Sequence, residues 1–259
     1  MVSDFDLAAA SYDVGFTNSS IGKAQRRRVY HYLDRWLDNE SGTVLELNCG
    51  TGTDAIYLTG KGQKVTATDA STAMLEQARE KAAGLNIRFR ELNLLDLDDP
   101  SLEKNYDLLF SNFGGLNCLH PAQLGRFLEQ AEKLMAPTGQ MILVLMSRSC
   151  LLEQWYYRYK SDPAAAKRRS DGGPLEVMVD GVAVPTWYYD PKDLESLLPQ
   201  NLKLVKAYPI GISIPPSYMQ QGMDKHPWLL KLGAVLEPLL ATPSLAHRGD
   251  HFIVKIERS

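Results

Sequence analysis

Cysteine is scarce in this sequence, with three residues among 259. Cys49, Cys118 and Cys150 are widely spaced and odd in number. They therefore exclude a disulfide framework, which needs paired cysteines, and a C-x-x-C metal site, which needs close spacing. The sequence also shows no convincing cluster of carboxylates beside its candidate site, so we predict no metal ion.

A surplus of positive charge is missing as well, because 28 Lys and Arg stand against 31 Asp and Glu, for a net charge of −3. A protein that binds DNA or RNA needs a basic surface to neutralise phosphates. Nucleic acid is therefore not expected as a partner. The densest basic run, Arg26-Arg27-Arg28, is interpreted as the solvated face of a helix.

Long apolar runs are absent, and none approaches the length of about 18 residues that a membrane-spanning helix requires. The segment "MVSDFDLAAASYD" at the start carries early acidic residues and no apolar core of signal-peptide length. We therefore expect a cytoplasmic protein with no membrane partner.

What the sequence does have is an alternation of short apolar runs with helical segments. Strands joined by helices form right-handed βαβ crossovers, which build a parallel sheet covered by helices on both faces. Two further alternating segments lie near the C-terminus, so we predict an α/β fold with a mostly parallel seven-stranded sheet. The expected strands are 43–47, 64–69, 87–94, 106–113, 140–147, 202–210 and 250–258.

The loop after the first expected strand contains Gly50-Thr51-Gly52-Thr53-Asp54-Ala55, which fits G-x-G-x-x-A. That pattern is typical of a dinucleotide site, but Glu46 just before the loop would repel a pyrophosphate. A cationic, phosphate-free ligand such as S-adenosylmethionine would instead be attracted by an acidic residue. Asp69, at the end of the second expected strand, is placed to accept both ribose hydroxyls of an adenosine.

Together, "VLELNCGTG" and "VTATDAS" closely resemble the glycine loop and acidic strand end of Rossmann-like, class I S-adenosylmethionine-dependent methyltransferases of the small-molecule type. The resemblance covers roughly residues 5–147 and, more loosely, the C-terminal strand pair. The family pattern is E/D-x-G-x-G-x-G, and this chain has Asn48 in place of its first glycine. Asn tolerates positive φ better than most residues do.

The resemblance implies a cofactor site for S-adenosylmethionine, with S-adenosylhomocysteine as product. Gly50 and Gly52 would let the backbone approach the methionine part, while Ala70 and Met74 would flank the adenine and Asn93 would bond its amino group. "ASYD" resembles the family's N-terminal lid, in which Tyr12 would close over the cofactor. The implied cofactor-binding residues are Tyr12, Glu46, Asn48, Gly50, Thr51, Gly52, Asp69, Ala70, Met74, Asn93, Leu94 and Ser111.

Methyl transfer to an acceptor depends mainly on positioning and desolvation, and a general base is needed only for a weakly acidic hydroxyl or a protonated amine. His120, after the fourth expected strand, is the candidate base; His251 is less favoured, and His31 looks structural. Aromatic and basic residues in an insertion after the fifth strand are candidates to hold the acceptor. The predicted substrate-binding residues are Phe113, Asn117, Tyr156, Arg168 and Tyr218.

We interpret residues 1–259 as a single methyltransferase domain. Within it we expect an N-terminal helical lid (1–40), a cofactor-binding core (41–147), a substrate-covering insertion (148–188) with a hairpin about Asp180-Gly181, and a C-terminal helix and strand pair (189–259). The expected function is methyl transfer to O, N or C of a small-molecule acceptor. An NAD-dependent oxidoreductase and a non-catalytic S-adenosylmethionine-binding protein remain alternatives. The acceptor and the oligomeric state stay open.

Overall fold

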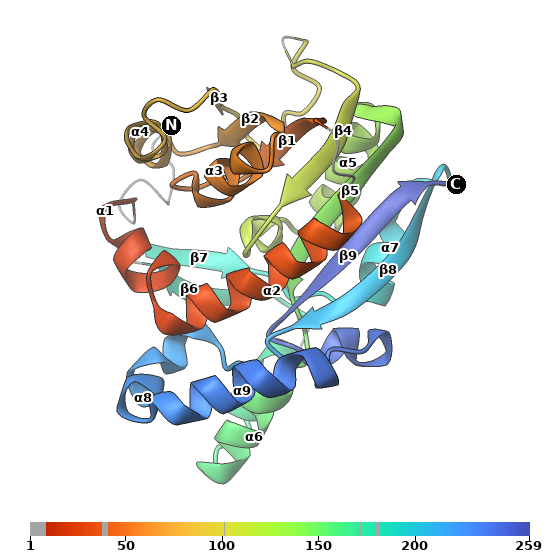
Figure 1. Ribbon diagram of the computed structural model, residues 1–259. Helices are drawn as coiled ribbons and strands as arrows, with labels where there is room; N and C mark the ends of the chain where they lie inside the picture. The colour runs from red at the N-terminus through yellow and green to blue at the C-terminus, as the bar shows by residue number, and fades with distance from the viewer. Residues whose placement is uncertain (1–8, 38–40, 101, 171, 180–181) are drawn as a thin grey trace.

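The computed structural model describes residues 9–37, 41–100, 102–170, 172–179 and 182–259, and it is built around one seven-stranded sheet (Figure 1). Six strands run in one direction and one strand near an edge runs antiparallel to them, which confirms the predicted α/β fold with a mostly parallel sheet. The parallel strands are β1 (Thr43–Leu47), β2 (Lys64–Asp69), β3 (Ile87–Glu91), β4 (Tyr106–Ser111) and β5 (Met135–Met146). The edge strand β8 (Leu202–Ile210) runs in the same direction, and β9 (His251–Arg258), which lies between β5 and β8, is the antiparallel strand.

The strand order β3-β2-β1-β4-β5-β9-β8 places the candidate site. From β1 the chain moves outward to β2 and β3, then returns to β4 on the other side of β1. The crossover helices after β1 and after β4 therefore leave in opposite directions. A crevice forms at such a switch point, beyond the carboxyl ends of the strands, and ligands of doubly wound folds bind there.

Helices cover both faces of this sheet, as predicted. On one face, α2 (Ser20–Trp36), α3 (Thr53–Gly60) and α4 (Thr72–Lys81) contribute buried side chains to a shared core with the strands. On the other face, α5 (Pro121–Glu132) and α7 (Pro191–Leu197) pack into a second core. Burial of these two apolar layers is the main source of stability in a fold of this kind.

The helix boundaries follow local capping chemistry. Ser19 accepts a hydrogen bond from the Gly22 amide at the start of α2, and Ser71 accepts one from Met74 at the start of α4. Pro121 occupies the first turn of α5, where a missing N–H costs nothing. On α2 the apolar stripe of Val29, Leu33 and Trp36 is buried.

The interpretation of the arginine run as a solvated helix face is wrong for one residue. Arg27 is exposed and Arg28 is half-buried, but Arg26 is only 7% exposed. The physical reason is a buried carboxylate on α3, Asp54, whose Oδ1 lies 3.0 Å from the Arg26 Nε. A guanidinium leaves water when a paired carboxylate replaces its hydration.

Two segments lie beyond the carboxyl end of β4 in Figure 1. The first is N-terminal and comprises α1 (Ala9–Tyr12) and a π-helical turn, η1 (Asp13–Thr17). The second belongs to the insertion after β5 and is the hairpin of β6 (Leu175–Val179) and β7 (Val182–Thr186). The predicted turn at Asp180-Gly181 lies outside the described residues. The insertion also contains α6 (Leu151–Tyr159) and the 3-10 turn η3 (Ala165–Ser170).

The segment that connects β8 to β9 forms a further layer, which flanks α6 in Figure 1. Among the helices that the structure describes, none is long and apolar enough to cross a membrane. The elements of this layer are η4 (Ser217–Met219), α8 (Gln220–Lys225), α9 (Pro227–Leu240) and η5 (Pro243–Arg248).

Candidate active site

The loop between β1 and α3 is held in an unusual backbone conformation. Asn48, Gly50 and Gly52 all have positive φ, at 50°, 52° and 74°. A Cβ at position 52 would also come within 2.9 Å of the Ala78 Cβ on α4, so this site requires glycine on two grounds. The expectation that Asn48 would tolerate the left-handed conformation of the family's first glycine is confirmed.

The Asn48 side chain connects this loop to the end of β4. Its Oδ1 accepts a hydrogen bond from the Ser111 hydroxyl at 2.6 Å, and its Nδ2 donates to the Asn112 carbonyl at 2.7 Å. Gly115 packs so closely that a Cβ there would lie 2.4 Å from the Asn48 Cγ. The departure from the family pattern therefore adds a polar link between the first and fourth strands.

Asp69, at the end of β2, holds the loop through its backbone. One carboxylate oxygen accepts from the Gly50 amide at 2.8 Å, and the other accepts from the Ser71 amide at 2.9 Å. Carboxylate oxygens have several acceptor positions, so both retain capacity for ribose hydroxyls. Nearby, Ala70 is exposed while Met74 is buried against Ala9. Met74 is thus placed where the N-terminal segment meets α4.

Glu46 lies beneath the loop and does not line its cavity. It is 1% exposed, and its Oε2 has no hydrogen-bond partner among the described residues. Burial raises the pKa of this carboxyl well above its usual range, the Asp54 carboxylate raises it further, and Arg26 opposes both. A cation near Glu46 would be stabilised by the ionised form of this group.

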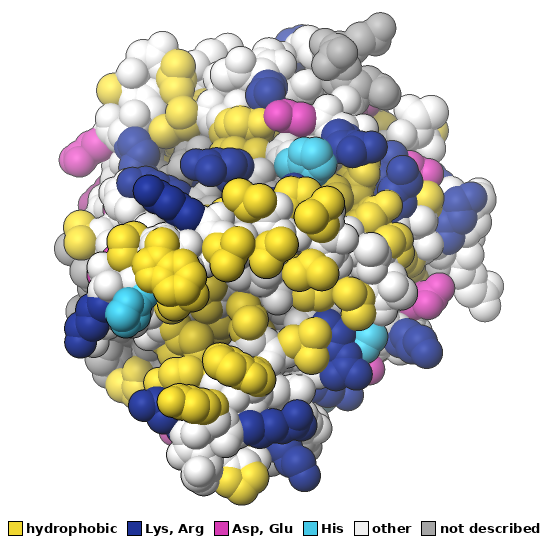
Figure 2. All heavy atoms as spheres, turned by 60° about the horizontal axis from the view of Figure 1, so that its bottom comes forward, with side chains coloured by type: hydrophobic (Ala, Val, Ile, Leu, Met, Phe, Trp, Pro, Cys, Tyr) yellow, Lys and Arg dark blue, Asp and Glu magenta, His cyan; other side chains and the backbone are white. Residues whose placement is uncertain are grey.

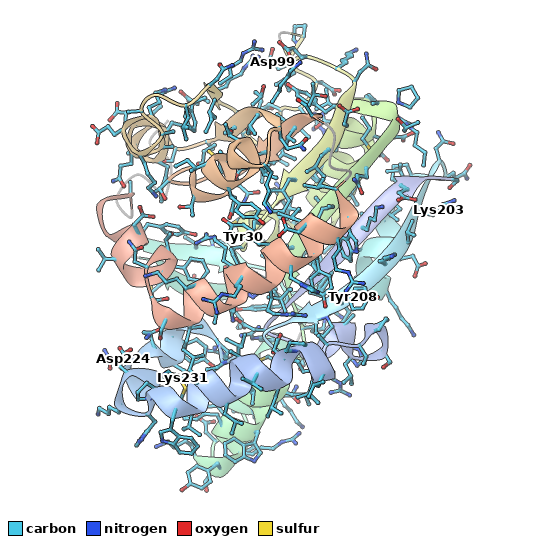
Figure 3. All side chains as sticks on the ribbon, viewed as in Figure 1. Tyr30, Asp99, Lys203, Tyr208, Asp224 and Lys231 are labelled. Carbon is cyan, nitrogen blue, oxygen red and sulfur yellow. The ribbon has the colours of Figure 1, made fainter. Side chains whose placement is uncertain are left out.

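The Arg26–Asp54 pair is the part of the site that the sequence prediction missed. Asp54 accepts hydrogen bonds from Arg26, from the Tyr30 hydroxyl at 2.6 Å and from the Asn112 amide at 2.9 Å. Tyr30 projects from α2 toward α3, where its ring stacks on Tyr57 with centroids 3.5 Å apart (Figure 3). Burial opposes the charge on Arg26, yet the nearby Asp54 carboxylate keeps the pKa of its guanidinium raised.

A sequence signal for Arg26 does exist, although the arginine run obscured it. Arg26 is three residues before Val29 and seven before Leu33, so it lies on the same helical stripe as both. A charged residue on a buried stripe needs a buried partner of opposite charge. Asp54 occupies a variable position of the glycine motif, close in space but 28 residues away in sequence.

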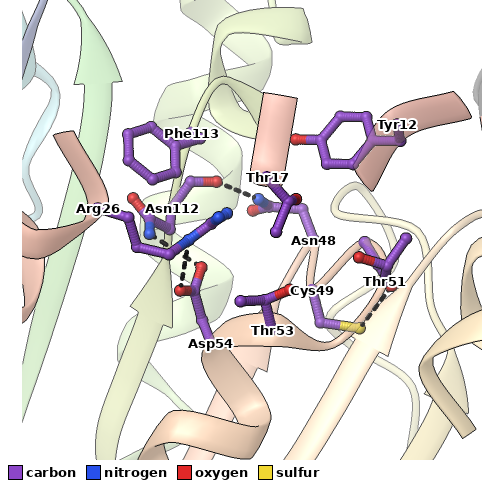
Figure 4. Close-up of a pocket in the computed structure, with 11 residues that line it drawn as sticks. Tyr12, Thr17, Arg26, Asn48, Cys49, Thr51, Thr53, Asp54, Asn112 and Phe113 are labelled. Atoms are coloured by element: carbon purple, nitrogen blue, oxygen red, sulfur yellow. Dashed lines mark hydrogen bonds and ion pairs between the residues drawn. The ribbon is translucent and has the colours of Figure 1, made fainter. Parts of the chain in front are cut away.

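A cavity of about 20 Å³ lies over the loop (Figure 4). Three buried polar atoms of residues lining it, Thr17 Oγ1, Arg26 Nη1 and Asn112 Oδ1, have no hydrogen-bond partner in the described part of the chain. Buried polar atoms are normally paired, so such a group is suited to a polar ligand. The lining residues are Tyr12, Thr17, Arg26, Asn48, Cys49, Gly50, Thr51, Thr53, Asp54, Asn112 and Phe113.

Aromatic rings form the outer wall of the cavity. The Phe113 ring lies 5.1 Å from the Phe16 ring and 5.1 Å from the Arg26 guanidinium. On its other side it meets His251 edge-on at 5.3 Å. Phe113 has positive φ, 46°, which turns the chain sharply after β4. Of the predicted substrate-binding residues, Phe113 is the one that lines this cavity.

The Asp13 carboxylate connects the N-terminal segment, α1 and η1, to the glycine loop and to α4. Asp13 accepts from the Thr51 hydroxyl at 2.6 Å and pairs with Lys81 at 2.5 Å. The Tyr12 ring then lies over Gly50, with its Cε1 3.9 Å from the position that a Cβ would occupy. This is the arrangement expected of a lid, and it brings Tyr12 and Thr51 to the predicted site.

Other predicted residues lie apart from the cavity. Asn93 is exposed, and its Oδ1 accepts from the Leu95 amide at 2.9 Å, while Leu94 packs on the core. His120 is exposed and caps α5, its Nδ1 accepting from the Ala122 amide at 3.2 Å. The Asn117 amide bonds the backbone of Met146 and Trp187, so it joins β5 to the insertion.

Two of the predicted substrate-binding residues, Arg168 and Tyr218, contact a buried carboxylate, Glu153 on α6. Arg168 donates to both of its oxygens, and the Tyr218 hydroxyl donates to Oε2 at 2.8 Å. Arg169, 6% exposed, also binds Glu153 and reaches Asp250 at 2.8 Å. Tyr156 lies outside this ion cluster, edge-on to Tyr157.

The ion cluster connects to the cavity wall through the start of β9. Asp250 is buried, and its carboxylate lies 3.3 Å from the His251 Nδ1. The His251 ring in turn contacts the Phe113 ring. Burial opposes the charge on Asp250, but His251 and Arg169 hold the pKa of the Asp250 carboxyl well below its usual range. His251 therefore lies between a buried carboxylate and the Phe113 ring. Among the described residues no group of three or more His, Cys, Asp or Glu could hold a metal ion.

A doubly wound sheet, a glycine loop bound by Asp69 and an acid under that loop define the class I, Rossmann-like methyltransferase fold. Residues 44–139 match the family model of the methyltransferase domain. Residues 44–139 therefore form a methyltransferase domain of the class I, Rossmann-like kind, and S-adenosylmethionine is the cofactor of that class.

Curated relatives share part of the chain. A malonyl-[acyl-carrier protein] O-methyltransferase of Priestia megaterium is 28% identical over 142 residues, covering 53% of this chain and 48% of its own. A demethylmenaquinone methyltransferase of Clavibacter sepedonicus is 30% identical over 141 residues, covering 54% and 55%. The chain therefore spans about half the length of these relatives.

Among solved structures, an S-adenosylmethionine-dependent methyltransferase of Methanosarcina mazei has the same fold. It is 17% identical, with a TM-score of 0.58 over 87% of this chain and 96% of its own. The residues of the site fit this cofactor, because Arg26 Nη1 is a buried donor for a carboxylate and Asn112 Oδ1 a buried acceptor for an amino group.

Replacing Asp69 with Ala is expected to weaken S-adenosylhomocysteine binding by about 1–3 kcal/mol, the loss typical of hydrogen bonds to a charged group. Titration calorimetry measures this directly. Asp34→Ala, which removes an exposed carboxylate paired with Lys61 on the surface, serves as the matched control and should leave affinity unchanged. Equal affinity in Asp69→Ala and wild type would remove Asp69 from the site.

The raised pKa of Glu46 predicts a pH-dependent affinity for S-adenosylmethionine. A cationic ligand favours ionised Glu46, so binding below the raised pKa releases a proton, and affinity increases with pH up to that pKa. Calorimetry in buffers of different ionisation enthalpy would count the released proton. In Glu46→Gln the release should disappear; its persistence there would assign the proton to another group.

Proposed function

We propose that this chain transfers the methyl group of S-adenosylmethionine to an O, N or C atom of a small or carrier-linked acceptor. The observation that carries the proposal is the charge balance under the glycine loop. Three carboxylates, Glu46, Asp54 and Asp69, lie near a single buried cation, Arg26. A pyrophosphate, with its negative charges, would be repelled by this excess of acid, whereas a sulfonium and an amino group would be attracted.

The surrounding residues are suited to hold such a ligand and to exclude water. Gly50 and Gly52 permit close backbone approach, Asp69 would hold the ribose, and Arg26 with Asn112 would hold the amino-acid part. When bound, S-adenosylmethionine supplies an electrophilic methyl group. Tyr12 and Phe16 from the N-terminal segment, together with Phe113, close an apolar wall beside it. Positioning and desolvation of the acceptor at this wall would provide most of the rate enhancement.

The activities by which these relatives are named suggest which acceptors to test first. They are the malonyl group on an acyl carrier protein and a demethylmenaquinone. One acceptor is a carrier-linked carboxylic acid and the other a lipophilic ring, so the two differ widely in chemistry. Labelled methyl transfer to both, beside an unbiased metabolite extract, would distinguish them.

Binding experiments separate this proposal from its rivals. We expect calorimetry to show S-adenosylmethionine and S-adenosylhomocysteine binding more tightly than NAD, because Arg26, the one Lys or Arg among the described residues that line the cavity, is already paired with Asp54. Tight NAD binding without the other two would establish an oxidoreductase. Binding of S-adenosylmethionine with no methyl transfer to any acceptor in the screen would favour a non-catalytic binding protein.

Two histidines are candidates for a general base, if the acceptor requires one. His120 remains the prediction from the sequence, although its Nδ1 caps α5. His251, the less favoured candidate from the sequence, lies against Phe113 with its Nδ1 3.3 Å from the Asp250 carboxylate. Alanine at the acting base should lower kcat by about 100-fold or more, with little change in cofactor affinity. If neither His120→Ala nor His251→Ala lowers kcat, transfer proceeds by positioning alone.

A further inference from the structure

Helix α9 buries a narrow face that includes a carboxylate. Its buried residues are Leu230, Gly233 and Glu237, which fall on one face at helical spacing. The opposite faces carry large apolar side chains in water, the reverse of an ordinary surface helix. These exposed residues are Trp228, Leu229, Leu232, Val235, Leu236, Leu239 and Leu240.

Specific contacts hold α9 in this orientation. The Glu237 carboxylate accepts hydrogen bonds from the backbone amides of Gly211, Ile212 and Ser213, at 2.7–3.2 Å, and from the Ser213 hydroxyl. Gly233 lies so close to the same segment that a Cβ would come within 2.2 Å of the Ser213 carbonyl oxygen. Rotating the helix to bury its leucines would break all of these contacts, so its apolar face stays outward.

The exposed face continues onto α6. Leu151, Trp155 and Tyr159 are exposed there, and Trp155 is 67% exposed. A groove of about 410 Å³ between the two helices is lined by Leu151, Leu152, Gln154, Trp155, Arg158, Ile212, Leu240 and Leu245. Figure 2 shows a broad apolar area on this side of the molecule with Lys and Arg at its margin. Contiguous apolar surface of this extent marks an interaction site.

The exposed charges within the two segments that form this face are cationic, and the nearest exposed acids in the sequence, Asp162 and Asp224, lie just beyond them. Residues 151–160 and 225–248 contain two acids, Glu153 and Glu237, and both are buried. The cations of the same segments are exposed or half-buried, although the whole chain carries a net charge of −3. They are Arg158, Lys160, Lys225, Lys231 and Arg248.

We propose that the α9–α6 face docks on an anionic phospholipid surface, with its leucines and tryptophans in the headgroup region and its cations on the phosphates. An apolar helix face bordered by Lys and Arg, with Trp in it, has the chemistry of interfacial membrane binding. A second copy of the chain is a poorer occupant, because a two-fold interface would place the cations of each face against those of the other. This partner differs from the expectation, based on the sequence, that the protein has no membrane partner.

Vesicle co-sedimentation of the full chain tests the proposal. Binding is expected to phosphatidylcholine vesicles that contain phosphatidylserine, to be weaker with phosphatidylcholine alone, and to fall as NaCl increases. Val235→Ser with Leu239→Ser should lower the partition coefficient by about tenfold or more. Lys231→Gln should lower it by about fivefold at low salt. Leu85→Ser, which removes an exposed leucine between α4 and β3, is the matched control and should bind as wild type.

Circular dichroism and S-adenosylhomocysteine affinity establish that each variant is folded, independently of vesicle binding. Wild-type protein that fails to sediment with either vesicle would overturn the proposal, as would equal losses in Leu85→Ser and the α9 variant. Light scattering measures whether the α9–α6 face instead forms a dimer. A dimer that strengthens with salt and is lost in Val235→Ser/Leu239→Ser, without vesicle binding, would assign the face to self-association instead.

Discussion

The ion pair between Arg26 and Asp54 is the interaction on which the rest of the candidate site depends. Asp54 begins α3 directly after the glycine loop, and it binds α2 through Arg26 and Tyr30 and the end of β4 through Asn112. Three elements far apart in sequence therefore meet at one carboxylate. Removing either partner would leave the other charge buried and unpaired, which is among the most destabilising changes in a protein interior. The same pair also presents the guanidinium to the cavity, so stability and ligand recognition share one contact.

The fold could be predicted from local features of the sequence. These are the periodicity of strands and helices and the φ preference of glycine, which depend on neighbouring residues alone. Asn48 shows this most clearly: its backbone conformation could be predicted from its position in the motif, whereas its links to Ser111 and Asn112 could not. Those links join strands more than 60 residues apart. Periodicity gives no information on which distant residue a side chain will meet.

The errors and omissions have the same physical origin. Arg26 was assigned to solvent since its carboxylate partner lies 28 residues away. Arg168 and Tyr218 were assigned to an acceptor because aromatic and basic residues together resemble a binding surface, yet both bind Glu153. Helix α9 could be anticipated as a helix, but its orientation depends on the Glu237 carboxylate and the 211–213 backbone. In each case a buried charge, and not apolar periodicity, decided how the element faces.

The connection that Asp13 makes to the loop and to α4 has a consequence for the timing of each catalytic cycle. A cavity of about 20 Å³ holds little more than one water molecule, so the N-terminal segment must move before any nucleoside can enter or leave. Its ion pair with Lys81 is partly open to solvent, and such pairs contribute about 1 kcal/mol or less. The other contacts of the segment, Phe16 with Phe113 and Ala9 with Met74, are side-chain packing, and loop motions that break such contacts occur on the microsecond to millisecond timescale. Exchange of product for fresh cofactor would then need no disruption of the sheet, and ionic strength would tune its rate.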